Sequence, residues 1–175
     1  MTALRKRNRD DVVIAEGWRP GVLGTIVTLH ARYYAQAWGF GPFFEAKVAR
    51  ELAEFLDHYD SDRDRLFLAL DGDQIAGSLV IDGRPADSKH AHLRWFIVDQ
   101  TCRGRGIGGR LMDSGIAFLR ERKFARCTLT TFAGLDVARR LYERAGFRLA
   151  GEMQALTWGM PVTEQIFEWQ SSQSG

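Results

Sequence analysis

The sequence predicts a single α/β (α+β) domain, in which a mixed, mostly antiparallel sheet carries helices on both faces. The length of 175 residues is that of one domain, and a hydrophobic content of 45% with 26% charged residues is typical of a globular protein. Segments with helical spacing are interspersed with short strand-like runs. One of these runs leads through a glycine- and arginine-rich turn into a helix, which is the arrangement of a phosphate-binding α/β protein.

The first half of the chain predicts one strand and two helices. Residues 11–18 form an apolar, strand-like run, and residues 24–38 have helical spacing in Ile26, Leu29, Tyr33 and Ala37. A break at residues 39–42 ends this first helix. A second helix then has one apolar face, made of Phe44, Val48, Leu52 and Phe55.

The second half predicts a hairpin, two more helices and four further strands. Residues 66–70 and 75–81 pair around a turn at residues 71–73. A strand follows at residues 90–98, and then a helix whose inner face is Ile107, Leu111, Gly115 and Phe118. The remaining predicted elements are a strand at 126–131, a helix that ends at Gly146, and strands at about 148–158 and 162–169.

The turn between the strand at 90–98 and the next helix is suited to bind an anion. Gly104, Gly106 and Gly108 alternate there, and glycine lets the backbone approach a ligand closely. The turn leads into a helix N-terminus, where unpaired N–H groups and the helix dipole favour negative charge. Positive charge is added by Arg103, Arg105 and Arg110. We call residues 103–110 the phosphate cradle; a glycine-rich turn without a ligand is the alternative.

Three kinds of phosphate-binding loop contain glycines at a similar density, and other residues distinguish them. A P-loop requires Lys and then Ser or Thr after its last glycine, whereas Arg110 and Leu111 follow Gly109 here. A dinucleotide-binding loop requires an acidic residue roughly 20 residues further on, and residues 128–131 contain none. Arg103-Gly104-Arg105-Gly106-Ile107-Gly108 instead resembles the pyrophosphate loop of the GNAT (Gcn5-related) N-acetyltransferase superfamily.

A second motif supports the same resemblance. Residues 136–147, with Leu141-Tyr142 and Gly146-Phe147, resemble the Ala-x-x-Leu-Tyr-x-x-x-Gly-Phe element of that superfamily. The resemblance implies the GNAT fold, in which the fourth and fifth strands splay apart. The chain also resembles the acetyltransferase half of bacterial MarR–GNAT fusion proteins. The segments that carry this resemblance are Leu29-His30-Ala31-Arg32-Tyr33-Tyr34, Trp38-Gly39-Phe40, residues 44–49, residues 131–136, Trp158-Gly159 and Glu164-Gln165. Too few residues precede these motifs for a winged helix, so we expect the free-standing enzyme half.

The resemblance implies transfer of acetyl from acetyl-CoA to a primary amine of a small molecule or peptide, by direct attack in a ternary complex. The alternative is a non-catalytic acyl-CoA-binding sensor or regulatory module. Tyr142 lies where the family has a general acid for the leaving thiolate, and a buried aromatic is its alternative role. His92 lies where the histone-acetylating branch has a glutamate, and is one candidate base. Glu45 on the second helix is the other candidate base, and a solvated charge is its alternative role.

The resemblance also implies the residues that hold acetyl-CoA. The backbone of Phe96, Ile97 and Val98 is expected to pair with the pantetheine arm like an added strand. The pyrophosphate is expected on Arg103, Gly104, Arg105, Gly106, Ile107 and Gly108, with Gly109 and Arg110 alongside. Asp136 lies beside the family's pantetheine-binding position and is also the expected helix N-cap. Arg139 is expected at the adenosine phosphate or, equally, on the surface.

Composition excludes several other classes of protein. No apolar run approaches the length of a membrane span, and no apolar segment of a secretion signal follows the basic start. Two cysteines form no disulfide framework, so we expect free thiols and a cytoplasmic location. We expect no metal and no nucleic acid as partner, a monomer or homodimer, a flexible basic terminus at 1–10 and a flexible tail at 171–175.

Overall fold

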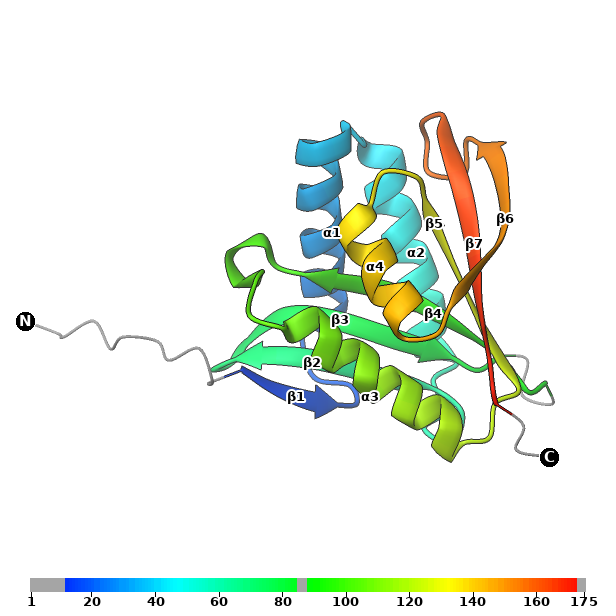
Figure 1. The fold of residues 1–175 in the computed structure, drawn as a ribbon. Coiled ribbons are helices and arrows are strands. Elements are labelled where there is room, and N and C mark those ends of the chain that lie inside the picture. The colour runs from blue at the N-terminus through cyan, green and yellow to red at the C-terminus, as the bar shows by residue number, and fades with distance from the viewer. Residues whose placement is uncertain (1–11, 85–87, 173–175) are drawn as a thin grey trace, which may run out of the picture.

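The computed structural model describes residues 12–84 and 88–172, so the predicted flexible terminus at 1–10 and most of the predicted tail at 171–175 lie outside the described residues. The described elements follow the predicted order along the chain (Figure 1). They are β1 (Val12–Glu16), α1 (Val22–Trp38), α2 (Pro42–Asp57), β2 (Arg65–Asp71), β3 (Gln74–Asp82), β4 (His90–Val98), the short 3-10 helix η1 (Gln100–Cys102), α3 (Ile107–Glu121), β5 (Arg126–Phe132), α4 (Asp136–Arg144), β6 (Arg148–Ala155) and β7 (Val162–Gln170).

The seven strands form one sheet in the order β1-β2-β3-β4-β5-β7-β6. Every neighbouring pair is antiparallel except β4 and β5, which are parallel. This parallel pairing joins only His90, Ala91 and His92 to residues 126–128. Beyond it the two strands separate, so the predicted mixed, mostly antiparallel sheet with splayed fourth and fifth strands is confirmed.

Helices cover both faces of the sheet, as predicted (Figure 1). On one face α1 and α2 pack through an apolar cluster that includes Ile26, Leu52 and Phe55. On the other face α3 and α4 pack through a second cluster around Leu111 and Phe167. Since the helices are divided two and two, a gap between β4 and β5 is flanked by α1 and α2 on one side and by α4 on the other.

The buried face of α1 differs from the predicted one. The sequence pattern selected Ile26, Leu29, Tyr33 and Ala37, whereas the buried residues are Val22, Ile26, Val27 and His30, and Ala37 is exposed. The pattern counted histidine as polar, but an internal hydrogen bond makes its burial possible: His30 Nδ1 donates to the Ile26 carbonyl oxygen at 2.8 Å.

The sequence predicted the C-terminal end of α4 correctly and its N-cap wrongly. At its C-terminal end Gly146 has φ +99°, and the N–H groups of Gly146 and Phe147 donate to the carbonyls of Glu143 and Tyr142, which is a Schellman cap. At the start, the predicted N-cap role of Asp136 is wrong by one residue, because Leu135 is the N-cap and Asp136 is the first helical residue. A carboxylate in the first turn still favours the helix through its dipole.

Gly83, directly after β3, lies at a closely packed position of the fold. A Cβ at Gly83 would lie 2.5 Å from the Arg63 carbonyl oxygen, whereas a Cβ at Gly151 on β6 meets no atom within 4 Å. We expect Gly83→Ala to destabilise the fold by about 1–3 kcal/mol through this overlap. Thermal melts should show a Tm several degrees lower for Gly83→Ala and no such fall for Gly151→Ala; equal melting temperatures would contradict the described packing.

Candidate functional site

The bulge in β4 sets the direction of the side chains around the gap. Trp95 has φ +44°, and the register with β3 shifts so that Trp95 and Phe96 both lie opposite Leu79. The Ser78 hydroxyl donates to the Trp95 carbonyl at 2.7 Å and fixes this irregular backbone. As a result Arg94 and Trp95 both lie on the side of α2, where the guanidinium covers the indole at 4.1 Å. Phe96 packs on the opposite face.

The phosphate cradle lies between β4 and α3, as the sequence predicts, and the short helix η1 connects it to β4. Gly104 and Gly106 both have φ +74°, and a Cβ at either would point into open space. Gly106 is the N-cap of α3, and the Arg110 N–H donates to its carbonyl at 3.1 Å. The N–H groups that precede Arg110 in the helix have no intrahelical acceptor, which leaves them for an anion.

The three arginines of the cradle also hold the loop in place. Arg103 Nε donates to the Val98 carbonyl at 3.3 Å, and its guanidinium covers the Tyr33 ring at 4.3 Å. Arg105 lies 3.2 Å from an Asp71 carboxylate oxygen. Arg110 donates to the Val12 carbonyl at 2.8 Å. The loop is therefore attached to α1, β1, β2 and β4.

Gly108 has a different role from the other two glycines of the motif. A Cβ there would lie 2.9 Å from Leu141 Cδ1 and 3.5 Å from Phe96 Cζ. Its lack of a side chain therefore lets the first turn of α3 pack closely against α4 and β4. The sequence motif alone does not separate this packing role from close approach to a ligand.

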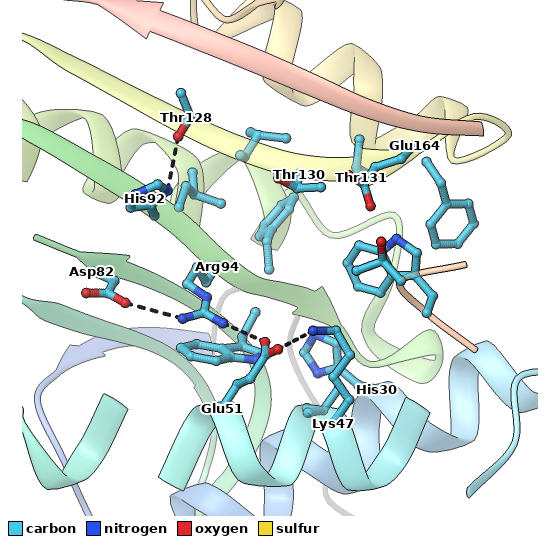
Figure 2. A pocket seen from close by; sticks show the side chains of 18 of the residues that line it. His30, Lys47, Glu51, Asp82, His92, Arg94, Thr128, Thr130, Thr131 and Glu164 are labelled. Carbon is cyan, nitrogen blue, oxygen red and sulfur yellow. Dashed lines mark hydrogen bonds and ion pairs between the residues drawn. The ribbon is translucent and has the colours of Figure 1, made fainter. Parts of the chain in front are cut away.

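A cavity of about 930 Å³ opens where β4 and β5 separate (Figure 2). Its walls come from α1, α2, β3, β4, β5, α4, β7 and the turn after β6. The sequence-predicted residues Tyr142, His92 and Phe96 all line it, but Glu45 does not. Glu45 is exposed in the first turn of α2. Of the two candidate bases, the structure thus places only His92 in the cavity.

Tyr142 is buried between the cavity and the core. Its ring packs on Phe96 and Phe167, each with centroids 5.9 Å away. Burial raises the pKa of Tyr142 well above its usual value, although a hydrogen bond with the Thr131 side chain opposes this shift. Burial likewise raises the pKa of Tyr34, and the neighbouring Tyr142 phenol raises it further. Both phenols are therefore protonated at neutral pH and can donate hydrogen bonds.

His92 lies at the other end of the cavity from Tyr142. Thr128 Oγ1 is 3.1 Å from His92 Nδ1 and 2.9 Å from His90 Nε2. Burial, followed by the effect of His90, lowers the pKa of His92, which favours a neutral ring. Thr128, the partner of His92, and Thr131, the partner of Tyr142, are three residues apart on β5, a rise of roughly 10 Å along the strand. In Figure 2 the His92–Thr128 pair lies to the left and Thr131 to the right, near Glu164.

The two remaining predicted cofactor residues lie on α4. Arg139 Nε is 2.8 Å from Glu143 Oε1, and the guanidinium lies 5.6 Å from the Phe167 ring centroid. The hydrogen bond to Glu143 raises the pKa of Arg139. Asp136 is exposed at the start of the helix. Neither side chain lines the cavity.

Several cavity residues were given no role by the sequence. On the α2 side Arg94 lies between Glu51, at 2.6 Å, and Asp82, at 3.3 Å, and Lys47 pairs with the same Glu51 (Figure 2). Glu164 on β7 is only 8% exposed and also lines the cavity. The Glu164-Gln165 motif carried a family resemblance but no chemistry, since a strand sequence does not reveal which cavity its side chains face.

The described part of the chain gives no sign of two other kinds of site. Within residues 12–84 and 88–172, no three His, Cys, Asp or Glu side chains are grouped so that they would hold a metal ion. The helices described there include none with the length and apolar character needed to cross a membrane.

Comparisons with known proteins agree with this geometry. The sequence pattern of the Acetyltransferase (GNAT) family matches residues 23–147. N-acetyltransferase 8 of Rattus norvegicus is 26% identical over 87% of this chain and 71% of its own length. N-acetylaspartate synthetase of Danio rerio is 27% identical over 75% of this chain, which spans only 46% of that protein. A GNAT family acetyltransferase from Elizabethkingia anophelis, solved with acetyl-CoA bound, is similar in fold: the TM-score is 0.61 at 15% identity, over 93% of this chain and 99% of that one.

His30, which lines the cavity, should make stability depend on pH. Burial lowers its pKa to about 4, against 6.5 for an unperturbed histidine. The unfolded chain therefore binds the extra proton first, and as pH falls from about 6.5 to about 4 the fold loses up to about 3 kcal/mol. Urea unfolding across this range should show a weaker pH dependence for His30→Gln than for the wild type.

The matched control for this prediction is His58→Gln. His58 also lies near the carbonyl of the residue four positions earlier, at 3.0 Å, but is exposed. Its variant should keep the pH dependence of the wild type. Identical pH dependence in His30→Gln and the wild type would show that burial of His30 does not disfavour protonation.

Proposed function

Because the chain belongs to the acetyltransferase (GNAT) family and is an N-acetyltransferase that uses acetyl-CoA, we propose that it acetylates a primary amine of a small molecule or peptide by direct attack in a ternary complex. The observation that carries this proposal is the cavity at the split between β4 and β5, next to the phosphate cradle. A non-catalytic acyl-CoA sensor would need the cradle but not a protonated phenol in the gap, so Tyr142 favours the enzyme.

The cavity passes from one face of the sheet to the other, which supports separate approaches for the two substrates. Tyr142 and Phe96 belong to the α3–α4 side. Phe132, at the end of β5, belongs to the α1–α2 side. The cradle starts α3, so we propose that acetyl-CoA lies toward α3 and α4 and that the amine enters from α1 and α2. Proximity of amine and thioester in the gap then replaces a bimolecular encounter.

The unpaired edge of β4 supports the predicted position of the pantetheine arm. After His92 the strand has no hydrogen-bonded neighbour on the β5 side, because the register of the two strands ends there. The backbone of Phe96, Ile97 and Val98 is therefore available to pair with an amide-containing chain like an added strand. The pyrophosphate then lies on the N–H groups from Gly104 to Gly109, with Arg103 and Arg110 beside it. Asp136 and Arg139 are kept as outer contacts of this cofactor.

The overall reaction determines how many protons the amine loses and where they go. A new N–C bond forms and the C–S bond breaks, while the ammonium loses two protons, one to the CoA sulfur and one to solvent. A lysine-like amine starts near pKa 10.4, so it must be deprotonated before it attacks. We propose Tyr142 as the acid that protonates the thiolate. Thr128 and Thr131, the β5 partners of His92 and Tyr142, are roughly 10 Å apart along the strand, so we propose that His92 would accept a proton only through water. The position of Glu45 outside the cavity gives no support to its role as base.

We propose the domain organisation, oligomeric state, partners and location of the enzyme from its sequence. We propose one domain over residues 1–175, a monomer or homodimer, and no nucleic acid as partner. Cys102 and Cys127 are both free and buried, which fits a reducing compartment such as the cytoplasm. The likeness to the acetyltransferase half of MarR–GNAT fusion proteins remains a proposal based on the motifs quoted above.

The cradle should be tested with Gly106→Val. A branched side chain at φ +74° is strained and points into the space proposed for the pyrophosphate. We expect CoA affinity, measured by calorimetry, to fall by at least about tenfold, since charge-assisted hydrogen bonds to phosphate are lost. Gly21→Val is the matched control, because Gly21 is also a left-handed N-cap, of α1, with open space at its Cβ. Unchanged CoA affinity in a folded Gly106→Val protein would remove the cradle from the site.

The acid should be tested with Tyr142→Phe. The change removes only the hydroxyl, so we expect kcat to fall by about 10²–10⁴ while CoA affinity stays near normal. Steady-state kinetics, a CoA titration and a thermal melt measure the three properties. Tyr59→Phe, outside the cavity, is the control for loss of a tyrosine hydroxyl. Full activity in Tyr142→Phe would assign thiolate protonation to water or to another group.

A further inference from the structure

Three residues that line the cavity have a buried polar atom without a hydrogen-bond partner in the part of the chain that the structure describes: Arg63 Nε, Glu164 Oε2 and Trp158 Nε1. The charge of Arg63 is paired with Asp60 and Asp64, which leaves Glu164 Oε2 and Trp158 Nε1 as the two atoms for a ligand. Buried polar groups in proteins are nearly always paired, and an unpaired buried carboxylate is especially costly. One is an acceptor and the other is a donor, so a single ligand with both complementary groups would satisfy them.

The two groups belong to the same wall of the cavity. Glu164 lies directly opposite Phe132 in the β5–β7 register, so its side chain shares the α1–α2 face with Phe132. The Trp158 ring packs 5.9 Å from Phe132 and 6.0 Å from Phe44. This is the face from which we propose that the amine enters.

The turn that carries Trp158 is held firmly in place. The Gly159 N–H donates to the Leu156 carbonyl at 2.9 Å and closes the turn between β6 and β7. A Cβ at Gly159 would lie 2.6 Å from the Phe43 ring, so only glycine allows the turn to pack this closely on α2. Both contacts restrain the turn that carries the indole N–H, and a restrained donor reduces the entropic cost of binding.

The charges around the cavity leave Glu164 available to a cation. Four basic side chains line the cavity, and each has carboxylate partners other than Glu164: Lys47 pairs with Glu51, Arg63 with Asp60 and Asp64, Arg84 with Asp82 and Glu54, and Arg94 with Glu51 and Asp82. Beside Glu164 the wall is aromatic, with Tyr34, Phe44, Phe132 and Trp158. Aromatic faces attract ammonium groups, so this end of the cavity is suited to a cation.

We infer that Glu164 binds the acceptor ammonium and takes its proton, while the Trp158 N–H holds an oxygen of the same acceptor. The acceptor class is then an amine with a carbonyl or carboxyl oxygen near its amino group, as in an amino acid or a peptide N-terminus. This inference rests on the proposed function. In the balanced reaction one N–H bond of the ammonium breaks toward the Glu164 carboxylate, which passes this proton to solvent. The other proton lost by nitrogen ends on the CoA sulfur.

The first experiment compares Glu164→Gln with Glu152→Gln, using leucinamide as the amine. Glu152 lies on the neighbouring strand of the same hairpin, opposite Gln165, and does not line the cavity. Glu164→Gln should lower kcat/KM by about 10²-fold or more, since both ammonium binding and proton transfer are lost. Glu152→Gln should retain activity. Titration of leucinamide into the CoA-saturated proteins measures binding without turnover. Leucinamide should bind more weakly to Glu164→Gln than to Glu152→Gln.

The second experiment tests the role of Trp158. Isoamylamine is leucinamide without its carboxamide, so the ratio of the two kcat/KM values reports contacts to that group. Comparison of this ratio between the wild type and Trp158→Phe cancels the difference in amine pKa. Loss of one neutral hydrogen bond should reduce the preference for leucinamide by about 3- to 10-fold. An unchanged ratio would overturn the proposed acceptor class.

The outcomes separate this inference from the proposed function. Wild-type protein that acetylates leucinamide, with Glu164→Gln within about threefold of Glu152→Gln, would overturn the role of Glu164 and leave the enzyme assignment intact. Acetylation of isoamylamine in preference to leucinamide by the wild type would overturn the acceptor class alone. If no CoA thiol is released from acetyl-CoA with these or any other primary amines, the proposed function itself fails. Unchanged leucinamide affinity in Glu164→Gln would then also exclude Glu164 from amine binding.

Discussion

Strands β4 and β5 share a parallel register over only three residue pairs, and the rest of the site depends on their separation. Continued pairing would satisfy the backbone of both strands and close the sheet. Instead the edge of β4 beyond His92 keeps free backbone groups, and the gap becomes a passage between the two faces. In the proposed function, the same local loss of hydrogen bonds provides both the binding edge for one substrate and the route for the other.

The separation is maintained by packing on both faces rather than by any single contact. The bulge at Trp95 turns two consecutive side chains toward α2 and leaves Phe96 on the opposite face. Phe132 at the end of β5 packs on aromatic rings of α1 and the β6–β7 turn. Closure of the gap would disrupt both apolar clusters, whose burial contributes most of the stability of such a fold.

The two ends of the cavity differ in electrostatics. Around Arg94 the opposite charges pair with one another, so that most of the charge at this end is balanced within the protein. Around Glu164 the wall is aromatic and the carboxylate is not matched by a basic side chain of the described residues. A charged ligand is selected most strongly where the protein leaves its own charge unmatched, and this contrast supports an ammonium at the Glu164 end.

The sequence by itself determined the order of elements, the cradle that joins β4 to α3, and the helix that carries Tyr142, because each depends on contiguous residues with local conformational demands. Tertiary structure decided which side chains share the cavity. It separated His92 from Tyr142, left Glu45 outside, buried His30, and brought in Glu164 from β7. These placements follow from strand register and helix packing between segments far apart in the chain, and no local pattern of residues encodes them.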